Sequence, residues 1–243
     1  MLSKNELKYI QSLCQKKQRV QEGLFIAEGP KLATELLNSN YEVKKIYATA
    51  NWIAQNPTSI DTTLVSETEL QKISSLQTAN EVLLICRQKE NKISPVLLGK
   101  LSLLIDGIQD PGNLGTIIRI ADWFGITQII ASEDTVELTN PKVIQSTMGS
   151  FIRVQCWYTH LPTLLKTTKL PVYGALLDGR SVMGVKPLNE GLLVIGNESK
   201  GIRPEVLPYI KHAITIPKLG GAESLNAAVA TGILLSHLCA MPK

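Results

Sequence analysis

Histidine and cysteine are scarce in this chain of 243 residues, and neither kind is clustered. A zinc site needs several such ligands at close spacing, so the sequence argues against a metal site. Isolated cysteines are more often small buried hydrophobic residues, as in proteins of a reducing compartment. The residues concerned are Cys14, Cys86, Cys156, Cys239, His160, His212 and His237.

Long apolar runs are missing as well. The longest candidate for a membrane span, residues 227–240, is interrupted by Thr231, Gly232, Ser236 and His237. The N-terminal sequence MLSKNELKYIQ lacks the apolar core of a secretory signal. We therefore expect a soluble, cytoplasmic protein without a membrane partner.

Several common catalytic signatures are also absent. No G-x-G-x-x-G follows a predicted strand, and there is no G-x-x-x-x-G-K-[ST], so neither a Rossmann dinucleotide site nor a P-loop is supported. There is no G-x-S-x-G, and no histidine is near Ser150 or Ser224 in the sequence. Nothing argues for a hydrolase triad, although triad members can be far apart in a sequence.

Charge is nearly balanced overall, but it is unevenly placed. Lys and Arg number 25 against 21 Asp and Glu, a formal net charge of +4. All of this excess lies in residues 1–19, where the only acid is Glu6. Such a stretch on a neutral body indicates a nucleic-acid contact, with an ordinary solvated face as the alternative. Its basic residues are Lys4, Lys8, Lys16, Lys17 and Arg19.

The sequence pattern predicts two α/β domains. Residues 3–17 are predicted to form a helix that starts with a capping-box pair, Ser3 and Glu6, and carries one apolar face. Residues 88–100 are polar and then contain Pro95 and Gly99, as is typical of a linker. The predicted domains are residues 1–92 and 101–243, joined by a linker at 93–100. The apolar face of this helix consists of Leu7, Ile10, Leu13 and Cys14. The predicted strands of the first domain are residues 24–28, 43–49, 62–65 and 82–87. Its other predicted helices begin near Pro30 and at a second capping box, Ser66 and Glu69.

In the second domain the predicted strands are apolar almost throughout, which is typical of a mostly parallel sheet covered on both faces. Ligands of such open α/β sheets bind beyond the carboxyl ends of the strands. The expected strands are 101–106, 128–131, 153–157, 172–177, 192–196 and 213–217, and the expected helices are 113–124, 141–148, 161–168 and 224–238.

Three loops at predicted strand ends call for an explanation. In DGIQDPGNLGTIIR, residues 106–119, Arg119 lies among apolar residues, and a salt bridge to Asp122 would explain it without any function. In GLLVIGNESKGI, residues 191–202, a buried strand delivers Glu198 to its carboxyl end, where a solvated turn is the alternative. In ITIPKLGGAESLNAAVA, residues 214–230, Ser224 is placed to cap a helix whose small residues allow close packing.

Together, in this order and spacing, the three loops resemble the motifs of the SpoU (TrmH) family of SPOUT methyltransferases. The segment STMGSFIRV, residues 146–154, is also similar to a family segment, and residues 20–90 look like the substrate-binding domain of ribosomal-RNA members. The resemblance implies an L30e-like N-terminal α/β domain and a C-terminal α/β SPOUT domain with a deep trefoil knot. It also implies methyl transfer from S-adenosylmethionine to a ribose 2′-hydroxyl of RNA, by a homodimer formed through the catalytic domain.

The resemblance assigns roles to residues that match the family's motifs. Arg119 is linked to activation of the 2′-hydroxyl. Because a guanidinium stays protonated, we expect it to clamp the adjacent phosphate and stabilise the developing alkoxide rather than act as a base. Asn113 and Glu198 are expected to orient Arg119 and the ribose. The remaining matches are Ser224 and Asn226 as catalytic-site residues and Leu176, Gly196, Asn197, Ile216 and Leu225 as cofactor contacts.

Three departures from the family pattern affect fine details of the pocket: Ser199, Lys218 and Ala228 stand where the family often has Gly, Met and Ser. The extra N-terminal domain favours ribosomal RNA over transfer RNA as substrate. A non-catalytic RNA-binding protein that retains the fold is the alternative from another class. If the basic segment binds RNA, deleting residues 1–19 is expected to weaken RNA binding and its salt dependence.

Overall fold

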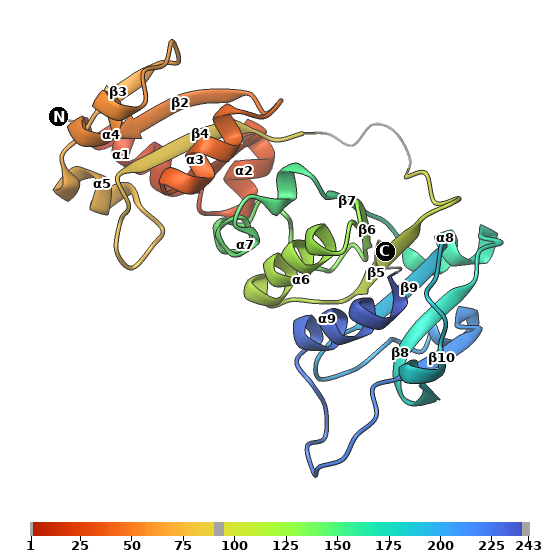
Figure 1. The fold of residues 1–243 in the computed structure, drawn as a ribbon. Helices are drawn as coiled ribbons and strands as arrows, with labels where there is room; N and C mark the ends of the chain where they lie inside the picture. The colour runs from red at the N-terminus through yellow and green to blue at the C-terminus, as the bar shows by residue number, and fades with distance from the viewer. Residues whose placement is uncertain (1, 90–94, 240–243) are drawn as a thin grey trace. The chain divides into compact units, whose positions relative to one another are not determined.

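The computed structural model describes residues 2–89 and 95–239, and the chain forms two compact units (Figure 1). Unit 1 consists of residues 1–90 and 137–152, and unit 2 consists of residues 91–136 and 153–243. Residues 137–152 thus pack with the first unit, although they lie well inside the second half of the sequence. Residues 93 and 94 of the predicted linker lie outside the described residues, and the domain boundaries stay a prediction.

Unit 1 is built on a four-stranded mixed sheet with the order β1-β4-β2-β3. Strand β4 is antiparallel to both of its neighbours, and β2 and β3 are parallel. The strands are β1 (Leu24–Glu28), β2 (Val43–Ala48), β3 (Thr62–Leu64) and β4 (Val82–Arg87), and the helices are α1 (Lys4–Ser12), α2 (Lys16–Glu22), α3 (Pro30–Leu37), α4 (Ala50–Gln55), α5 (Glu67–Ile73), α7 (Pro141–Thr147) and the 3-10 turn η1 (Ser150–Ile152).

The N-terminal segment differs from the predicted single helix over residues 3–17. Ser3 caps α1 as expected, but the carboxylate of Glu6 accepts a hydrogen bond from the Tyr47 hydroxyl instead of closing a capping box. The helix ends at Ser12: Leu13 still has helical dihedral angles, but Gln15 is extended, with φ −95° and ψ 134°. Ile10 and Leu13 are fully buried in the core of unit 1. A second helix, α2, then begins at Lys16. The predicted capping box at Ser66 is confirmed.

Two residues of this segment were assigned to the wrong environment. Arg19 is not an exposed cation: its side chain is 2% exposed, it donates to the Leu13 carbonyl at 2.9 Å, and it pairs with the carboxylate of Glu137. Cys14, expected on the apolar face, is exposed. Deleting residues 1–19 would therefore remove buried core as well as charge, so the lysines have to be tested by substitution.

Residues 137–152 are held in unit 1 by buried side chains. Phe151 packs edge-on against Phe25 of β1 and against Tyr41, with ring centroids 6.0 and 5.3 Å apart. Gly149 has a positive φ of 96°, and a Cβ there would lie 3.2 Å from the Glu35 side chain. Together with the Arg19–Glu137 pair, these contacts make the segment part of the core of unit 1.

Unit 2 contains a six-stranded sheet with the order β10-β8-β9-β5-β6-β7, and every neighbouring pair is parallel. The predicted parallel α/β architecture is confirmed, whereas the trefoil knot stays a prediction. The strands are β5 (Leu101–Asp106), β6 (Gln128–Ala131), β7 (Gln155–Tyr158), β8 (Val172–Ser181), β9 (Gly191–Gly196) and β10 (His212–Thr215), and the helices are α6 (Pro111–Trp123), α8 (Leu161–Thr167), α9 (Ala227–Leu238) and the 3-10 turns η2 (Val182–Gly184) and η3 (Leu207–Tyr209).

Helices cover both faces of this sheet. Neighbouring residues of a strand point to opposite faces, and both Leu103 and Leu104 of β5 are fully buried. On one face Leu104 belongs to a core with Leu161 and Leu165 of α8. Helix α9 contacts β9 and lies beside α6 (Figure 1). Gly232 of α9 faces Ile120 of α6, so the small residues of the predicted helix do permit close packing of another helix.

Two helix starts in unit 2 differ from their predicted positions. Asp110 caps α6, which therefore begins at Pro111 instead of Asn113. Asn226, not Ser224, caps α9, because its side-chain oxygen accepts from the N–H groups of Ala228 and Val229. Strand β8 continues beyond residue 177 to Ser181. Over the parts of the chain that the structure describes, no helix has the length and apolarity needed to span a membrane.

Candidate active site

The carboxyl ends of β5 and β9 lie side by side in unit 2. These strands are paired along their whole length, from Leu101 opposite Gly191 to Asp106 opposite Gly196. From β5 the chain builds outward through β6 and β7, and it then returns to place β9, β8 and β10 on the other side. The boundary between β5 and β9 is therefore a topological switch point, where open α/β sheets bind their ligands.

Three of the predicted catalytic-site residues are joined by hydrogen bonds at this edge. The side-chain N–H of Asn226 donates to the side-chain oxygen of Asn113 at 2.8 Å. The side-chain N–H of Asn113 in turn donates to the carboxylate of Glu198. We call this series the amide relay; it connects the three loops that the sequence singled out. The donor and acceptor roles are fixed at one end of the relay. The side-chain oxygen of Asn226 already accepts from the first turn of α9, so its side-chain N–H is the group that faces Asn113.

The loop after β9 is closed by its own backbone. Asn197 and Gly201 exchange two backbone hydrogen bonds of 3.0 and 2.9 Å. The Asn197 side chain accepts from two N–H groups of the loop and donates to the Gly107 carbonyl at 2.8 Å. A Cβ at Gly196 would lie 2.3 Å from the Gly201 backbone, so only glycine fits. Gly196 and Asn197, predicted as cofactor contacts, thus have structural roles that shape this loop.

A buried ion pair at the same edge was missed by the sequence analysis. Asp106, the last residue of β5, is fully buried, and Arg203 donates to its carboxylate from both the backbone N–H at 2.8 Å and Nε at 2.6 Å. Burial alone lowers the pKa of Arg203, but the hydrogen bonds and charge of Asp106, followed by the charges of Asp134 and Glu205, raise it above its usual value. The available signal was a carboxylate at the end of an apolar strand and a cation directly after GNESKGI.

Arg119 is exposed on α6, six residues or about 1.7 turns beyond Asn113. The alternative salt bridge to Asp122 is not formed, because the Asp122 carboxylate binds Arg153 at 2.9 Å. Within residues 2–89 and 95–239, no hydrogen bond or ion pair engages the Arg119 guanidinium. The expectation that Arg119 sits in an apolar setting is wrong; its charge faces outward and is uncommitted.

The third loop, residues 216–226, extends away from the sheet between β10 and α9 (Figure 1). Its backbone N–H and C=O groups at residues 217–225 make no hydrogen bonds to other described backbone groups. Ser224 is exposed there, Leu225 is 46% exposed, and Ile216 and Leu176 are partly exposed. The structure therefore does not join Ser224 to the amide relay.

These residues suit an adenosyl cofactor. Partly exposed aliphatic side chains such as Ile216 and Leu225 can cover the faces of a purine, and free backbone groups of residues 217–225 can pair with its polar edge. The backbone groups of the loop are uncharged and match a neutral base, and its charged side chains are Lys218 and Glu223. Across the described parts of the chain, no three His, Cys, Asp or Glu side chains gather as the ligands of a metal ion do.

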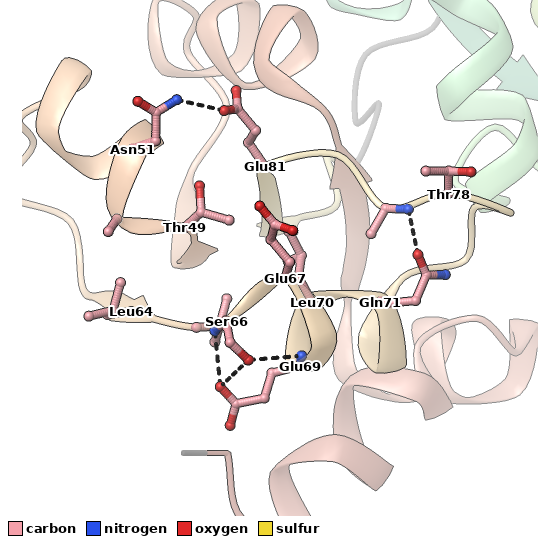
Figure 2. A pocket seen from close by; sticks show the side chains of 13 residues that line it. Thr49, Asn51, Leu64, Ser66, Glu67, Glu69, Leu70, Gln71, Thr78 and Glu81 are labelled. Atoms are coloured by element: carbon pink, nitrogen blue, oxygen red, sulfur yellow. Dashed lines mark hydrogen bonds between the residues drawn. The ribbon is translucent and has the colours of Figure 1, made fainter.

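A pocket of about 1000 Å³ lies in unit 1, formed by β3, α5, the start of α4 and residues 78–81 (Figure 2). Glu67, Glu69 and Glu81 line it together with neutral polar side chains. Glu69 is engaged by Ser66 in the capping box, and Glu81 accepts from Asn51 at 2.7 Å. Three carboxylates would repel an RNA backbone, so we do not assign phosphate binding to this pocket.

Comparison with known proteins agrees with the geometry at both units. The SpoU rRNA Methylase family matches residues 100–236, and the MRM3-like substrate binding domain matches residues 4–84. The chain is 32% identical over 229 residues to the 23S rRNA (guanosine(2553)-2′-O)-methyltransferase RlmP of Bacillus subtilis, covering 92% of this chain and 91% of that protein.

Two solved structures are similar over nearly the whole chain. A protein of the TrmH family from Porphyromonas gingivalis superimposes with a TM-score of 0.87 at 37% identity, over 98% of each chain. An AdoMet-bound rRNA methyltransferase from Sinorhizobium meliloti gives a TM-score of 0.86 at 28% identity, over 98% of this chain and 95% of that one. This protein is therefore a member of the SpoU rRNA methylase family.

Proposed function

We propose that this protein transfers the methyl group of S-adenosylmethionine to a ribose 2′-hydroxyl of large-subunit ribosomal RNA in the cytoplasm. The observation that carries the proposal is the amide relay at the carboxyl edge of the sheet. It joins Asn113 of α6 to Glu198 of the loop after β9 and to Asn226 at the start of α9, and α6 also carries the uncommitted Arg119. Family membership supplies the reaction class, and a substrate-binding domain matched over residues 4–84 favours ribosomal over transfer RNA.

The residues of this chain have separate tasks in the proposed reaction. The cofactor supplies an electrophilic methyl group. Arg119 stays protonated at neutral pH, so its guanidinium attracts the RNA phosphate and stabilises negative charge on the 2′-oxygen. Loss of the hydroxyl proton to phosphate or water is consistent with this role. The relay fixes the orientation of Glu198 and leaves its second carboxylate oxygen available to the ribose or cofactor.

The decisive experiment maps 2′-O-methylated nucleotides in total RNA from cells with and without the protein. We expect one position in large-subunit ribosomal RNA to lose its methyl group. A lost position in transfer RNA would change the substrate and keep the chemistry. No change at any position, together with failure of the purified protein to bind S-adenosylmethionine, would favour the non-catalytic RNA-binding alternative.

Exposed lysines of unit 1 are proposed to contact the RNA backbone. Lys4, Lys8, Lys16 and Lys17 are all exposed on α1 and α2. Replacing these four with glutamine should weaken RNA binding and reduce the slope of log K against log salt by about 0.7–0.9 for each phosphate that is no longer neutralised. The measurement is a salt titration of RNA affinity, with Lys44→Gln as control because Lys44 lies on β2, outside α1 and α2, and is in close contact with Glu42, whereas Lys16 is 68% exposed and 3.9 Å from Glu137. An unchanged slope would show that these lysines form only a solvated face.

We further propose a homodimer formed through unit 2. Trp123 at the end of α6 is 85% exposed and Val229 on the adjacent α9 is 51% exposed, which is a large apolar area for a free surface. Trp123→Glu should shift the protein from dimer to monomer in sedimentation velocity at micromolar concentration. Val20→Glu is the control, because Val20 is 65% exposed but lies in unit 1. A Trp123→Glu variant that stays dimeric would contradict this interface.

A further inference from the structure

Arg203 follows the glutamate-bearing loop of the candidate site directly, and its contacts differ from those of an ordinary surface cation. Its Nε and one terminal nitrogen lie 2.6 and 2.5 Å from the same oxygen of Asp106, and its backbone N–H donates to the other oxygen at 2.8 Å. Asp106 is completely buried, whereas the Arg203 side chain is 30% exposed. The other carboxylates near the guanidinium, on Asp134 and Glu205, are exposed and lie at 3.4 and 3.6 Å.

The loop of residues 197–202 begins and ends beside one residue, Asp106. Gly196, immediately before the loop, is the strand partner of Asp106. Arg203, immediately after the loop, binds the Asp106 side chain. Both ends of the loop are thereby fixed to the end of β5, and the tip of the loop carries Glu198, which accepts from Asn113.

Few other contacts hold the tip. The loop's internal hydrogen bonds, around Asn197 and Gly201, make it a closed turn but do not tie it to the sheet. Its attachments to the neighbouring loop are Asn197 to the Gly107 carbonyl, and Glu198 to Asn113. Without the Arg203 side chain, the returning end of the loop keeps its backbone hydrogen bond to Asp106 and the buried side chain of Ile202, but it loses the only described side-chain hydrogen bonds to the end of β5.

We infer that Arg203 is a positioning residue for the methyl transfer. By binding Asp106 it fixes the loop, and the loop in turn holds Glu198 where it accepts the hydrogen bond of Asn113. The inference rests on the proposed function, because it concerns the same site. An arginine is required, since its planar group reaches the buried oxygen through two nitrogens at once, which a lysine ammonium cannot reproduce. A role limited to fold stability predicts different behaviour, and the following variants separate the two.

The first experiment compares Arg203→Met, Arg203→Lys and Glu205→Gln. We expect Arg203→Met to lower kcat by about tenfold or more, measured well below its unfolding temperature, because small misplacements at a reacting centre are costly. Arg203→Lys should recover part of the loss. Glu205→Gln removes an exposed carboxylate 3.6 Å from the same guanidinium, which does not tie the loop to β5, and should leave kcat unchanged. An unchanged kcat in folded Arg203→Met would overturn the inference.

The second experiment uses the buried charge that Arg203→Met leaves without its partner. Adding Asp106→Asn removes this charge, so the double variant should regain thermal stability. It should not regain kcat, because the Arg203 side chain is still missing. Recovery of both stability and kcat would mean that Arg203 acts only through the fold, and would overturn the positioning role.

The third experiment asks whether Arg203 acts through Glu198. In a double-mutant cycle, adding Arg203→Met to Glu198→Gln should lower kcat by less than about threefold further, because the two residues belong to one unit. Multiplicative losses would contradict the inference. Calorimetric titration of the wild-type protein with S-adenosylmethionine is run alongside: absence of binding there would refute the proposed function itself, independently of Arg203.

Discussion

Replacing Arg119 with alanine is expected to abolish methyl transfer while the fold and cofactor binding are retained. The guanidinium is exposed and has no partner within the described residues, so its removal breaks no structural contact. Electrostatic groups aimed at developing charge typically contribute about 10²–10³ in rate, and Arg119 is the one described charge of α6 without a partner. The measurement is single-turnover methylation of ribosomal RNA, with S-adenosylmethionine affinity from calorimetric titration.

Two further variants make the Arg119 result interpretable. Lys200→Ala removes another exposed cation, from the loop that carries Glu198, and should reduce turnover little. Arg119→Lys keeps the charge as a compact ammonium and should retain partial activity if the group stabilises an oxyanion. If Arg119→Ala lost cofactor binding and turnover together, Arg119 would be a structural residue of the cofactor loop and the proposed role would be wrong.

Replacing Asn113 with aspartate is expected to disable the site in a pH-dependent way. The substitution keeps the shape of the side chain but places a carboxylate where an N–H now donates to Glu198. Two carboxylates at hydrogen-bond distance raise the pKa of one of them in the folded state. The folded protein then binds more protons than the unfolded chain, so the free energy of unfolding falls as the pH rises through that raised pKa and recovers on acidification.

The measurement for Asn113→Asp is thermal unfolding and methyl transfer between about pH 5 and 8, a range in which buried carboxylate pairs titrate. We expect at least a 10²-fold loss of turnover at pH 8, because the repulsion breaks the hydrogen bond to Glu198 and displaces the loop that carries it. Asn113→Ala removes the donor without adding charge. Its losses of unfolding temperature and of turnover, relative to wild type, should therefore be the same across this pH range. An Asn113→Asp deficit as flat as that of Asn113→Ala would show that the two side chains do not share a hydrogen bond in solution.

The sequence predicts a helix or strand correctly wherever its local pattern of apolar residues matches the burial of that segment in the fold. The apolar runs at residues 101–106 and 128–131 are strands at the predicted positions. Each strand is buried on both faces of the sheet, which explains why its residues are almost all apolar. The helix boundaries were harder, because residues 13–15 include helix-forming residues, yet Gln15 leaves the helical conformation and becomes the N-cap of α2. Leu13 still has helical dihedral angles, so local preference does not locate the break.

The candidate site was accessible only in part. The motif resemblance pointed to Asn113, Glu198 and Asn226, and these three side chains lie in one hydrogen-bonded series. The pairing of Asp106 with Arg203 joins residues 97 apart in the sequence, and no local pattern connects them. The cap of α9 was misassigned to Ser224, because serine and asparagine cap helices about equally well and only the backbone path decides between them.

The incorporation of residues 137–152 into unit 1 affects how such enzymes can be recombined. Exchanging residues 1–89 for those of a relative would bring a new surface against Phe151 and Glu137, which the host chain would still supply. A graft limited to the N-terminal segment would therefore inherit mismatched aromatic and ionic contacts. A chimera that also carries the donor's residues 137–152 keeps both sides of these contacts together.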